Sequence, residues 1–145
     1  MIKNRKAHFE FEVLECIEAG IVLLGTEVQS LRKGQASLAG AYARIEGRAI
    51  KLFGMHIDPH PHSAHNHDPL RTRTLLLHRR EIDKLRPKVE QRGLTLVPMA
   101  VYFDEHGRAK IDLVLARGRN KRDKRRAIRD REHDREIRLV NKGHR

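Results

Sequence analysis

The 145-residue chain contains few aromatic residues, a single cysteine and no long apolar run. Aromatic residues make up 4% of the sequence and tryptophan is absent, which argues against a sheet that stacks several bases on aromatic rings. Cys16 alone excludes an internal disulfide, and its strand-like surroundings predict a small buried side chain. No segment reaches the ~18 apolar residues of a transmembrane helix. Because an apolar signal core is also missing at the start, we expect a cytoplasmic protein with no membrane partner.

Motifs of the common enzyme classes are also missing. The sequence has no glycine-rich phosphate loop, no G-x-S-x-G and no HExxH. Glu10 and Glu12 lie two residues apart in a strand-like segment, where exposed strand positions explain them better than a paired acid and base. The sequence therefore predicts a protein that is not an enzyme and needs no cofactor.

A histidine-rich segment is the candidate for metal binding. Its histidines are His56, His60, His62, His65 and His67. Imidazole nitrogens bind zinc, nickel or copper, but this spacing repeats no known site. A polar loop is the favoured interpretation, and a metal-dependent nuclease that uses the loop stays open as an alternative.

Basic residues are abundant and unevenly distributed. The formal net charge is +12, and residues 118–145 include twelve Lys or Arg and five Asp or Glu, a net charge of +7. The few apolar side chains of this segment cannot bury enough surface to fold alone. We therefore expect a folded body, residues 1–117, and a basic C-terminal tail, residues 118–145, that is disordered when free. A basic tail indicates a polyanionic partner, most often nucleic acid.

The body has the alternation of apolar residues that is typical of β-strands. Phe9 and Phe11 share one parity with later apolar residues, which predicts a half-buried strand in residues 8–17. Pro98 interrupts the parity of a later strand and predicts a bulge or a sheet edge there. Similar patterns predict a hairpin at 42–57 and strands at 94–103 and 109–115.

Two segments have helical spacing. The first ends at Gly34, with Thr26 as the candidate N-cap and Glu27 at the positive end of the helix dipole. The second spans residues 78–93, where Pro87 predicts two short pieces, the second opening at the proline. Five to seven strands with two or three short helices predict a mainly β fold, a small antiparallel barrel.

Basic side chains of the body are candidate nucleic-acid contacts. Arg71 and Arg73 are two residues apart, so in an extended segment both face the same side and can contact phosphates. Lys110 projects from a strand whose opposite face is apolar. This composition favours binding by phosphate contact and shape, to DNA or to RNA.

Several segments form an ordered set along the chain. They are NRKA at 4–7, EAGIVLLGTEVQSLRKG at 18–34, DPLRTRTLLLHRREI at 68–82, GLTLVPMAVYF at 93–103 before a strand ending in LARG, DKR at 123–125 and NKGHR at the end. Together they resemble the SmpB family of SsrA-binding proteins, the partners of transfer-messenger RNA in bacterial trans-translation. The likeness covers almost the whole chain.

The resemblance implies an oligonucleotide-binding-like antiparallel barrel with about three short helices. It also implies an adaptor that binds the tRNA-like domain of transfer-messenger RNA (SsrA RNA), replaces the missing anticodon arm and delivers the RNA to stalled ribosomes. The tail would enter the empty mRNA channel and become helical against small-subunit ribosomal RNA. The alanine-charged RNA, delivered with elongation factor Tu, would then accept the stalled peptide for tagging. The protein is expected to act as a monomer.

The resemblance also assigns residues. The implied RNA contacts are Asn4, Glu18, Leu76 and Lys110, with Arg71 and Arg73 as supporting phosphate contacts. The implied ribosome contacts of the tail are Gly118, Asp123, Lys124, Arg125, His133, Leu139 and Val140.

The chain departs from the family pattern at a few positions. Phe9 and Phe11 replace His and Tyr, Thr74 replaces the lysine before the LLL run, Asn120 replaces a tail lysine, and His133 falls where some members have Trp. These changes bring particular contacts into question. A general RNA chaperone or ribosome-associated RNA-binding protein stays open as the alternative function.

Overall fold

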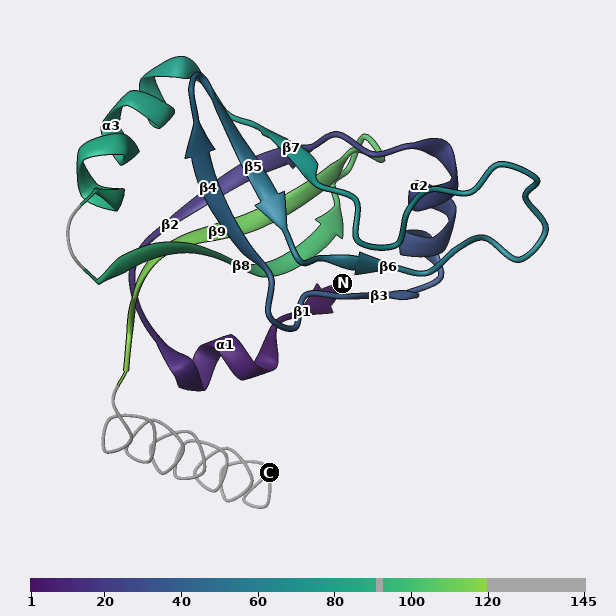
Figure 1. Ribbon diagram of the computed structural model, residues 1–145, viewed down its shortest axis with the longest axis horizontal. Coiled ribbons are helices and arrows are strands. Elements are labelled where there is room, and N and C mark those ends of the chain that lie inside the picture. Colours follow the sequence, from purple (N-terminus) through teal and green to yellow (C-terminus); the bar gives the residue numbers. More distant parts are fainter. Residues whose placement is uncertain (91–92, 120–145) are drawn as a thin grey trace, which may run out of the picture.

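The structure, a computed structural model, describes residues 1–90 and 93–119 (Figure 1). Its helices in this part of the chain are α1 (Arg5–Glu10), α2 (Gly25–Arg32) and α3 (Arg79–Val89). Its strands there are β1 (Ile2–Lys3), β2 (Phe11–Ile21), β3 (Ala36–Ser37), β4 (Tyr42–Glu46), β5 (Ala49–Phe53), β6 (His56–Ile57), β7 (Arg73–Leu76), β8 (Leu94–Phe103) and β9 (Ala109–Gly118). The predicted mainly β fold with three short helices is confirmed.

Seven of these strands form one antiparallel sheet that closes on itself. The strand order is β1-β8-β4-β5-β7-β2-β9, and β9 pairs again with β8, so the sheet makes a barrel-like ring. Strands β3 and β6 form a separate two-stranded sheet. In Figure 1 the β4–β5 hairpin crosses in front of β2 and β9, with α3 and α2 to its two sides and α1 below.

Apolar side chains pack on both faces of the β8–β9 pair. The main core fills the barrel, where Ile50, Leu52 and Leu113 are fully buried. A smaller core lies under α1, whose Ala7 packs against Val97, Met99, Val114 and Ala116. Neighbouring residues of a strand point to opposite faces, so one pair of strands can supply both cores.

The predicted irregularity at Pro98 separates these two cores. The β8–β9 register shifts between Pro98 and Ala100. Val97 and Met99 consequently pack under α1, whereas Val101 joins the barrel core. The bulge adds one residue to β8 and so changes which face the following side chains occupy.

The strand predicted for residues 8–17 and the predicted burial of Cys16 need correction. Residues 5–10 form helix α1, so Phe9 and Glu10 lie in a helix and β2 begins only at Phe11. The Asn4 side chain accepts a hydrogen bond from the Ala7 N–H at 3.3 Å and caps this helix, a signal that alternation does not reveal. Cys16 is exposed rather than buried, because it alternates with Ile17 and Ala19, which face the barrel core.

Helix α3 continues through Pro87 instead of breaking there. The proline stands in the last turn, so its missing N–H removes a single hydrogen bond of the helix. The Glu90 N–H still bonds to the Arg86 carbonyl at 3.1 Å. Ile82 and Leu85 are buried, and their packing on the barrel holds the helix in one piece.

Asn4 is buried, with 4% of its surface exposed, and both ends of its side-chain amide bind the protein itself. The Nδ2 group donates to the Pro98 carbonyl at 2.9 Å, while Oδ1 caps α1. The side chain thus joins α1 to the bulge of β8. The expected direct RNA contact does not fit this position.

We predict that Asn4→Ala lowers the free energy of unfolding by about 1–3 kcal/mol, since it removes a helix cap and leaves a buried carbonyl without its donor. Urea denaturation measures the loss. Asn4→Asp keeps the capping oxygen but turns a carboxylate oxygen toward the Pro98 carbonyl in a buried site, so it should lose at least as much. Wild-type stability in Asn4→Ala together with weakened RNA binding would restore Asn4 to the RNA contacts.

Candidate nucleic-acid interface

Four neighbouring strands present one row of residues on the outside of the barrel. Antiparallel pairing places Leu76 of β7 opposite Gly20 of β2, Gly20 opposite Lys110 of β9, and Lys110 opposite Tyr102 of β8. Directly opposed residues point to the same face of a sheet. Leu76, Lys110 and Tyr102, which are far apart in sequence, therefore stand side by side.

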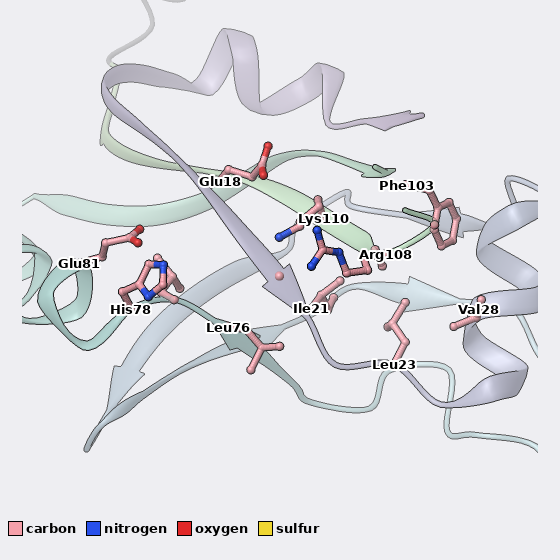
Figure 2. A pocket seen from close by; sticks show the side chains of 14 residues that line it. Glu18, Ile21, Leu23, Val28, Leu76, His78, Glu81, Phe103, Arg108 and Lys110 are labelled. Carbon is pink, nitrogen blue, oxygen red and sulfur yellow. The ribbon is translucent and has the colours of Figure 1, made fainter. Parts of the chain in front are cut away.

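This row borders an open pocket of about 660 Å³ (Figure 2). Glu18, Leu76 and Lys110, three of the residues assigned to RNA binding, all line it. Figure 2 shows Leu76 on one side of β2 and Lys110 on the other. His78 and Arg108 also line the pocket. The structure thus brings together three of the six predicted RNA-binding residues.

Gly20 keeps the centre of the row open. A Cβ atom at this position would lie 3.2 Å from the Leu76 Cβ atom, which is tighter than an ordinary contact. A larger residue here would push against Leu76, whose side chain is 57% exposed. Gly20 therefore leaves Leu76 as an apolar surface that a ligand can cover.

Glu18 is held by a tyrosine. The Tyr102 hydroxyl donates to Glu18 Oε2 and lies 3.2 Å from Asp112 Oδ1, the carboxylate opposite Glu18 in the β2–β9 register. The hydrogen bond to Glu18, burial and the two negative charges together raise the pKa of Tyr102 above its usual value. The phenol therefore stays protonated and keeps Glu18 on the outer face.

Lys110 is left available for a ligand. The ion pairs formed within the described residues do not include it. With Glu18 held by Tyr102, the ammonium can meet a phosphate. The pocket therefore combines an anion-binding group, a hydrogen-bond acceptor and an apolar surface, a combination that suits a nucleic acid.

Arg71 and Arg73 lie elsewhere and form a buried cluster with Glu27 of α2. Glu27 and Arg73 are both 0% exposed. The Arg71 guanidinium approaches Glu27 Oε1 at 2.5 Å and Arg73 approaches Oε2 at 2.5 Å. Arg73 also donates to the Met55 and Pro69 carbonyls. A phosphate contact does not fit Arg73, since its guanidinium is enclosed and satisfied by the protein.

The charges of this cluster depend on one another. Burial alone would raise the pKa of Glu27, but hydrogen bonds from Arg71, the Leu24 N–H and Arg73 outweigh it, so the pKa is lowered. Burial also lowers the pKa of Arg73, against the raising effect of Glu27. The single carboxylate therefore pairs with two guanidinium groups, one of which is fully buried, and the cluster keeps a net positive charge.

Of the five loop histidines, His67 is buried and fixes the loop between β6 and β7 to α2. Its Nε2–H donates to the Ile57 carbonyl at 2.9 Å, and Nδ1 lies 2.8 Å from the Thr26 hydroxyl. Because α2 begins at Gly25 and its N-cap is Leu24, Thr26 lies inside the helix rather than at its predicted N-cap position. In the described part of the chain, no three metal-ligating side chains come together.

Sequence reasoning missed Tyr102 and Gly20 as parts of the site. Neither residue type indicates a binding role by itself. Only the register, which sets Gly20 between Leu76 and Lys110 and sets Tyr102 beside Lys110, identifies them.

The chain matches a family model over most of its length. The model, described as SmpB protein, covers residues 1–142. The chain belongs to the SmpB family. The SsrA-binding protein of Thermosynechococcus vestitus is 50% identical over 137 residues, which cover 93% of this chain and 90% of that protein. The SsrA-binding protein of Gloeobacter violaceus is 51% identical over 138 residues, 94% of this chain and 90% of that protein.

A solved structure, described as "tmRNA-SmpB: a journey to the center of the bacterial ribosome", also matches. Its TM-score is 0.70 with 46% sequence identity, and the match covers 88% of this chain and 94% of that chain. The likeness supports the barrel fold expected of an SmpB family member. None of the helices among residues 1–90 and 93–119 is long and apolar enough to span a membrane.

At one departure from the SmpB pattern, a lysine on the neighbouring strand supplies the positive charge that Thr74 lacks. Thr74 is the position at which the resemblance predicts a lysine, and its hydroxyl accepts a hydrogen bond from Lys51 Nζ at 2.7 Å. Lys51 is directly opposite Thr74 in the β5–β7 register. This chain therefore places an ammonium at the same part of the sheet from another strand.

Most of the tail assignments lie outside the described residues. These are Asp123, Lys124, Arg125, His133, Leu139 and Val140, together with Asn120. Gly118 is described: it is the exposed last residue of β9 and pairs with Phe11. The Arg119 N–H bonds to the Glu10 carbonyl at 2.8 Å, so β9 leads out of the barrel beside the end of α1.

We predict that Tyr102 ionises at a higher pH than an ordinary tyrosine, and that Glu18→Ala lowers this pKa because it removes the main hydrogen-bond acceptor. The chain has two tyrosines and no tryptophan, so ultraviolet titration of the phenolate follows them cleanly. Tyr102→Phe should abolish the high-pH transition and so assign it. An unchanged titration in Glu18→Ala would contradict the contact.

We predict that Glu27→Ala lowers the free energy of unfolding by about 3–5 kcal/mol, because it leaves a buried guanidinium without its counter-charge. Urea denaturation measures the loss. Glu15→Ala is the matched control, since it breaks an exposed pair with Lys88 and should cost below about 1 kcal/mol.

The Glu27 cluster also makes the stability of the fold depend on pH in a definite direction. The folded pKa of Glu27 lies below its unfolded value of 4.5, so its contribution is present above pH 4.5 and is lost as the pH falls through the folded pKa. The difference in stability between wild type and Glu27→Gln should shrink over that acid range. A constant difference would show that folding does not lower the pKa of Glu27.

Proposed function

We propose that this protein is an RNA-binding adaptor of trans-translation, which binds the tRNA-like domain of transfer-messenger RNA and delivers it to stalled ribosomes. The observation that supports this most is the convergence of Glu18, Leu76 and Lys110 on one pocket in a member of the SmpB family. These three residues come from β2, β7 and β9. Their assignment came from separate motifs, and the barrel places them within one surface.

Each of the three side chains has its own chemistry toward RNA. Lys110 attracts a phosphate. Leu76 offers an exposed apolar surface to a base or a ribose. Glu18 repels phosphate, so it accepts from a base amino group or a 2′-hydroxyl. Because Tyr102 contacts Oε2 of Glu18, Oε1 is the oxygen that faces the RNA.

Arg73 and Asn4 contribute to RNA binding by positioning. Arg73 fixes the start of β7, three residues before Leu76, and Asn4 fixes α1 against β8. The Arg71 side chain is 30% exposed, so it can add a phosphate contact from the edge of the cluster. The positions of these groups relative to one another are set by the barrel, which brings together segments that are far apart in the sequence.

The remaining parts of the adaptor follow from the family. The basic tail, residues 118–145, enters the empty mRNA channel and becomes helical against small-subunit ribosomal RNA. The protein works as a cytoplasmic monomer beside elongation factor Tu and the alanine-charged RNA, and it catalyses no reaction itself. The RNA encodes the degradation tag and the stop codon.

Two variants separate the body from the tail. Lys110→Ala should weaken binding of the tRNA-like domain at ~150 mM salt, where non-specific contacts are reduced. Lys33→Ala, which removes an exposed ammonium from the end of α2, is its control. A chain that ends at Gly118 should still bind the tRNA-like domain but should lose peptide tagging on stalled ribosomes. Filter binding and an in vitro tagging assay measure the two effects.

An equal affinity for the tRNA-like domain and for a duplex of the same length would favour a general RNA chaperone instead. Loss of tRNA-like domain binding on truncation at Gly118 would contradict the division between body and tail.

A further inference from the structure

A second group of side chains lies on the outer surface of the β4–β5 hairpin, where Tyr42 and Arg44 are exposed and Phe53 is partly buried. Tyr42 and Phe53 are cross-strand partners whose ring centroids lie 5.5 Å apart with 20° between their planes. The Arg44 guanidinium carbon lies 4.7 Å from the Phe53 centroid and 5.9 Å from the Tyr42 centroid. We call these three residues the stacking platform.

The platform has no role in the core of the barrel. Residues Ala43, Ile50 and Leu52 of the same hairpin face inward and are buried. Tyr42 faces the other way and is 41% exposed. A large, half-exposed ring that is already stacked on a neighbouring ring suits stacking on a base as well.

Lys51 adds a positive charge beside the platform. It is opposite Arg44 in the register, and its ammonium donates one hydrogen bond to Thr74, which leaves two N–H groups for a ligand. Thr72, one residue before β7, is exposed, so its hydroxyl can add a neutral phosphate contact. Glu46 is the acidic side chain of this surface, 3.8 Å from Arg44.

The platform and the pocket belong to one continuous surface. Lys51 of β5 is opposite Thr74 of β7, and Leu76, which lines the pocket, is two residues further along the same face of β7. A strand that leaves the pocket past Leu76 therefore meets Lys51 and then the rings of Tyr42 and Phe53.

We propose that the stacking platform binds unpaired nucleotides of the RNA whose folded part occupies the pocket. Aromatic and arginine planes stack on the faces of bases, and Lys51 takes a phosphate. A duplex hides the faces of its bases, so the platform selects a single strand. This inference rests on the proposed function, because it assumes that the pocket binds RNA.

Base stacking can be measured directly. The probe is a uridine-rich RNA octamer with a central 2-aminopurine, whose fluorescence falls when the base stacks. The full-length chain should quench it. Tyr42→Ala should remove the quenching and weaken octamer binding at least about 5-fold, the lower end of what one stacked base contributes. Tyr42→Phe, which keeps the ring, should retain both effects.

The phosphate contact has a separate readout. Lys51→Gln should reduce the slope of log affinity for the octamer against log salt by about 0.7, the contribution of one phosphate contact on a single strand. Lys33→Gln removes an exposed charge at the end of α2, away from the hairpin, and is the matched control. Equal slopes in the two variants would contradict the phosphate contact.

The outcomes distinguish the platform from the pocket. Loss of octamer stacking in Tyr42→Ala with unchanged quenching in Lys110→Ala supports the platform. Wild-type quenching in Tyr42→Ala, or tighter binding of a duplex than of the octamer, overturns it while leaving the pocket in place.

If Lys110→Ala does not weaken binding of the tRNA-like domain, the proposed function fails whatever Tyr42 does. A folded Tyr42→Ala chain that binds the octamer normally but loses a protein partner would assign the platform to that protein.

Discussion

The buried carboxylate of Glu27 determines much of the geometry on which the site depends. It holds Arg71 and Arg73 to α2, and Arg73 in turn bonds to two backbone carbonyls. This fixes where β7 begins, and therefore which residue of β7 stands opposite Gly20. A shift of β7 by one residue would turn Leu76 into the barrel and close the pocket on that side. Under the proposed function, Arg73 therefore supports RNA binding through the position of Leu76, and Arg71 can in addition contact a phosphate.

The electrostatics of the surface follow from the same register. Glu18 and Asp112 are directly opposed carboxylates, an arrangement that repels, and Tyr102 bridges them with its hydroxyl. The tyrosine holds Glu18 by a hydrogen bond, and among the described residues Lys110 takes part in no ion pair, so its ammonium is available for a phosphate. A protein of net charge +12 attracts RNA without direction. The placement of Lys110, Glu18 and Leu76 around a single pocket provides a defined place on the surface where this attraction can act.

Local patterns predicted much of the fold but not its first element or its second core. The hairpin, the irregularity at Pro98 and helix α2 have strong local signals, and all three are present. The second arm of the hairpin is shorter than predicted, because β5 ends at Phe53 and β6 (His56–Ile57) pairs with β3 in the separate sheet. Alternation at Phe9 and Phe11 indicated a strand, yet Asn4 caps a helix there because it can also bond to the Pro98 carbonyl. That partner is far away in sequence. Pro87 was expected to divide α3, but the packing of Ile82 and Leu85 outweighs one lost hydrogen bond.

The sequence by itself determined the class of partner, the mainly β fold and, through its ordered motifs, the family. These depend on charge, alternation and residue identity, all of which are local. Only the tertiary structure decided which basic residues are available. Arg71 and Arg73 look alike as a pair in the sequence, but burial against Glu27 encloses one and leaves the other partly exposed. The strand register places Tyr102 and Gly20 beside Lys110, and burial removes Asn4 from the candidates for direct contact. Both register and burial arise from contacts between segments that are distant in the sequence.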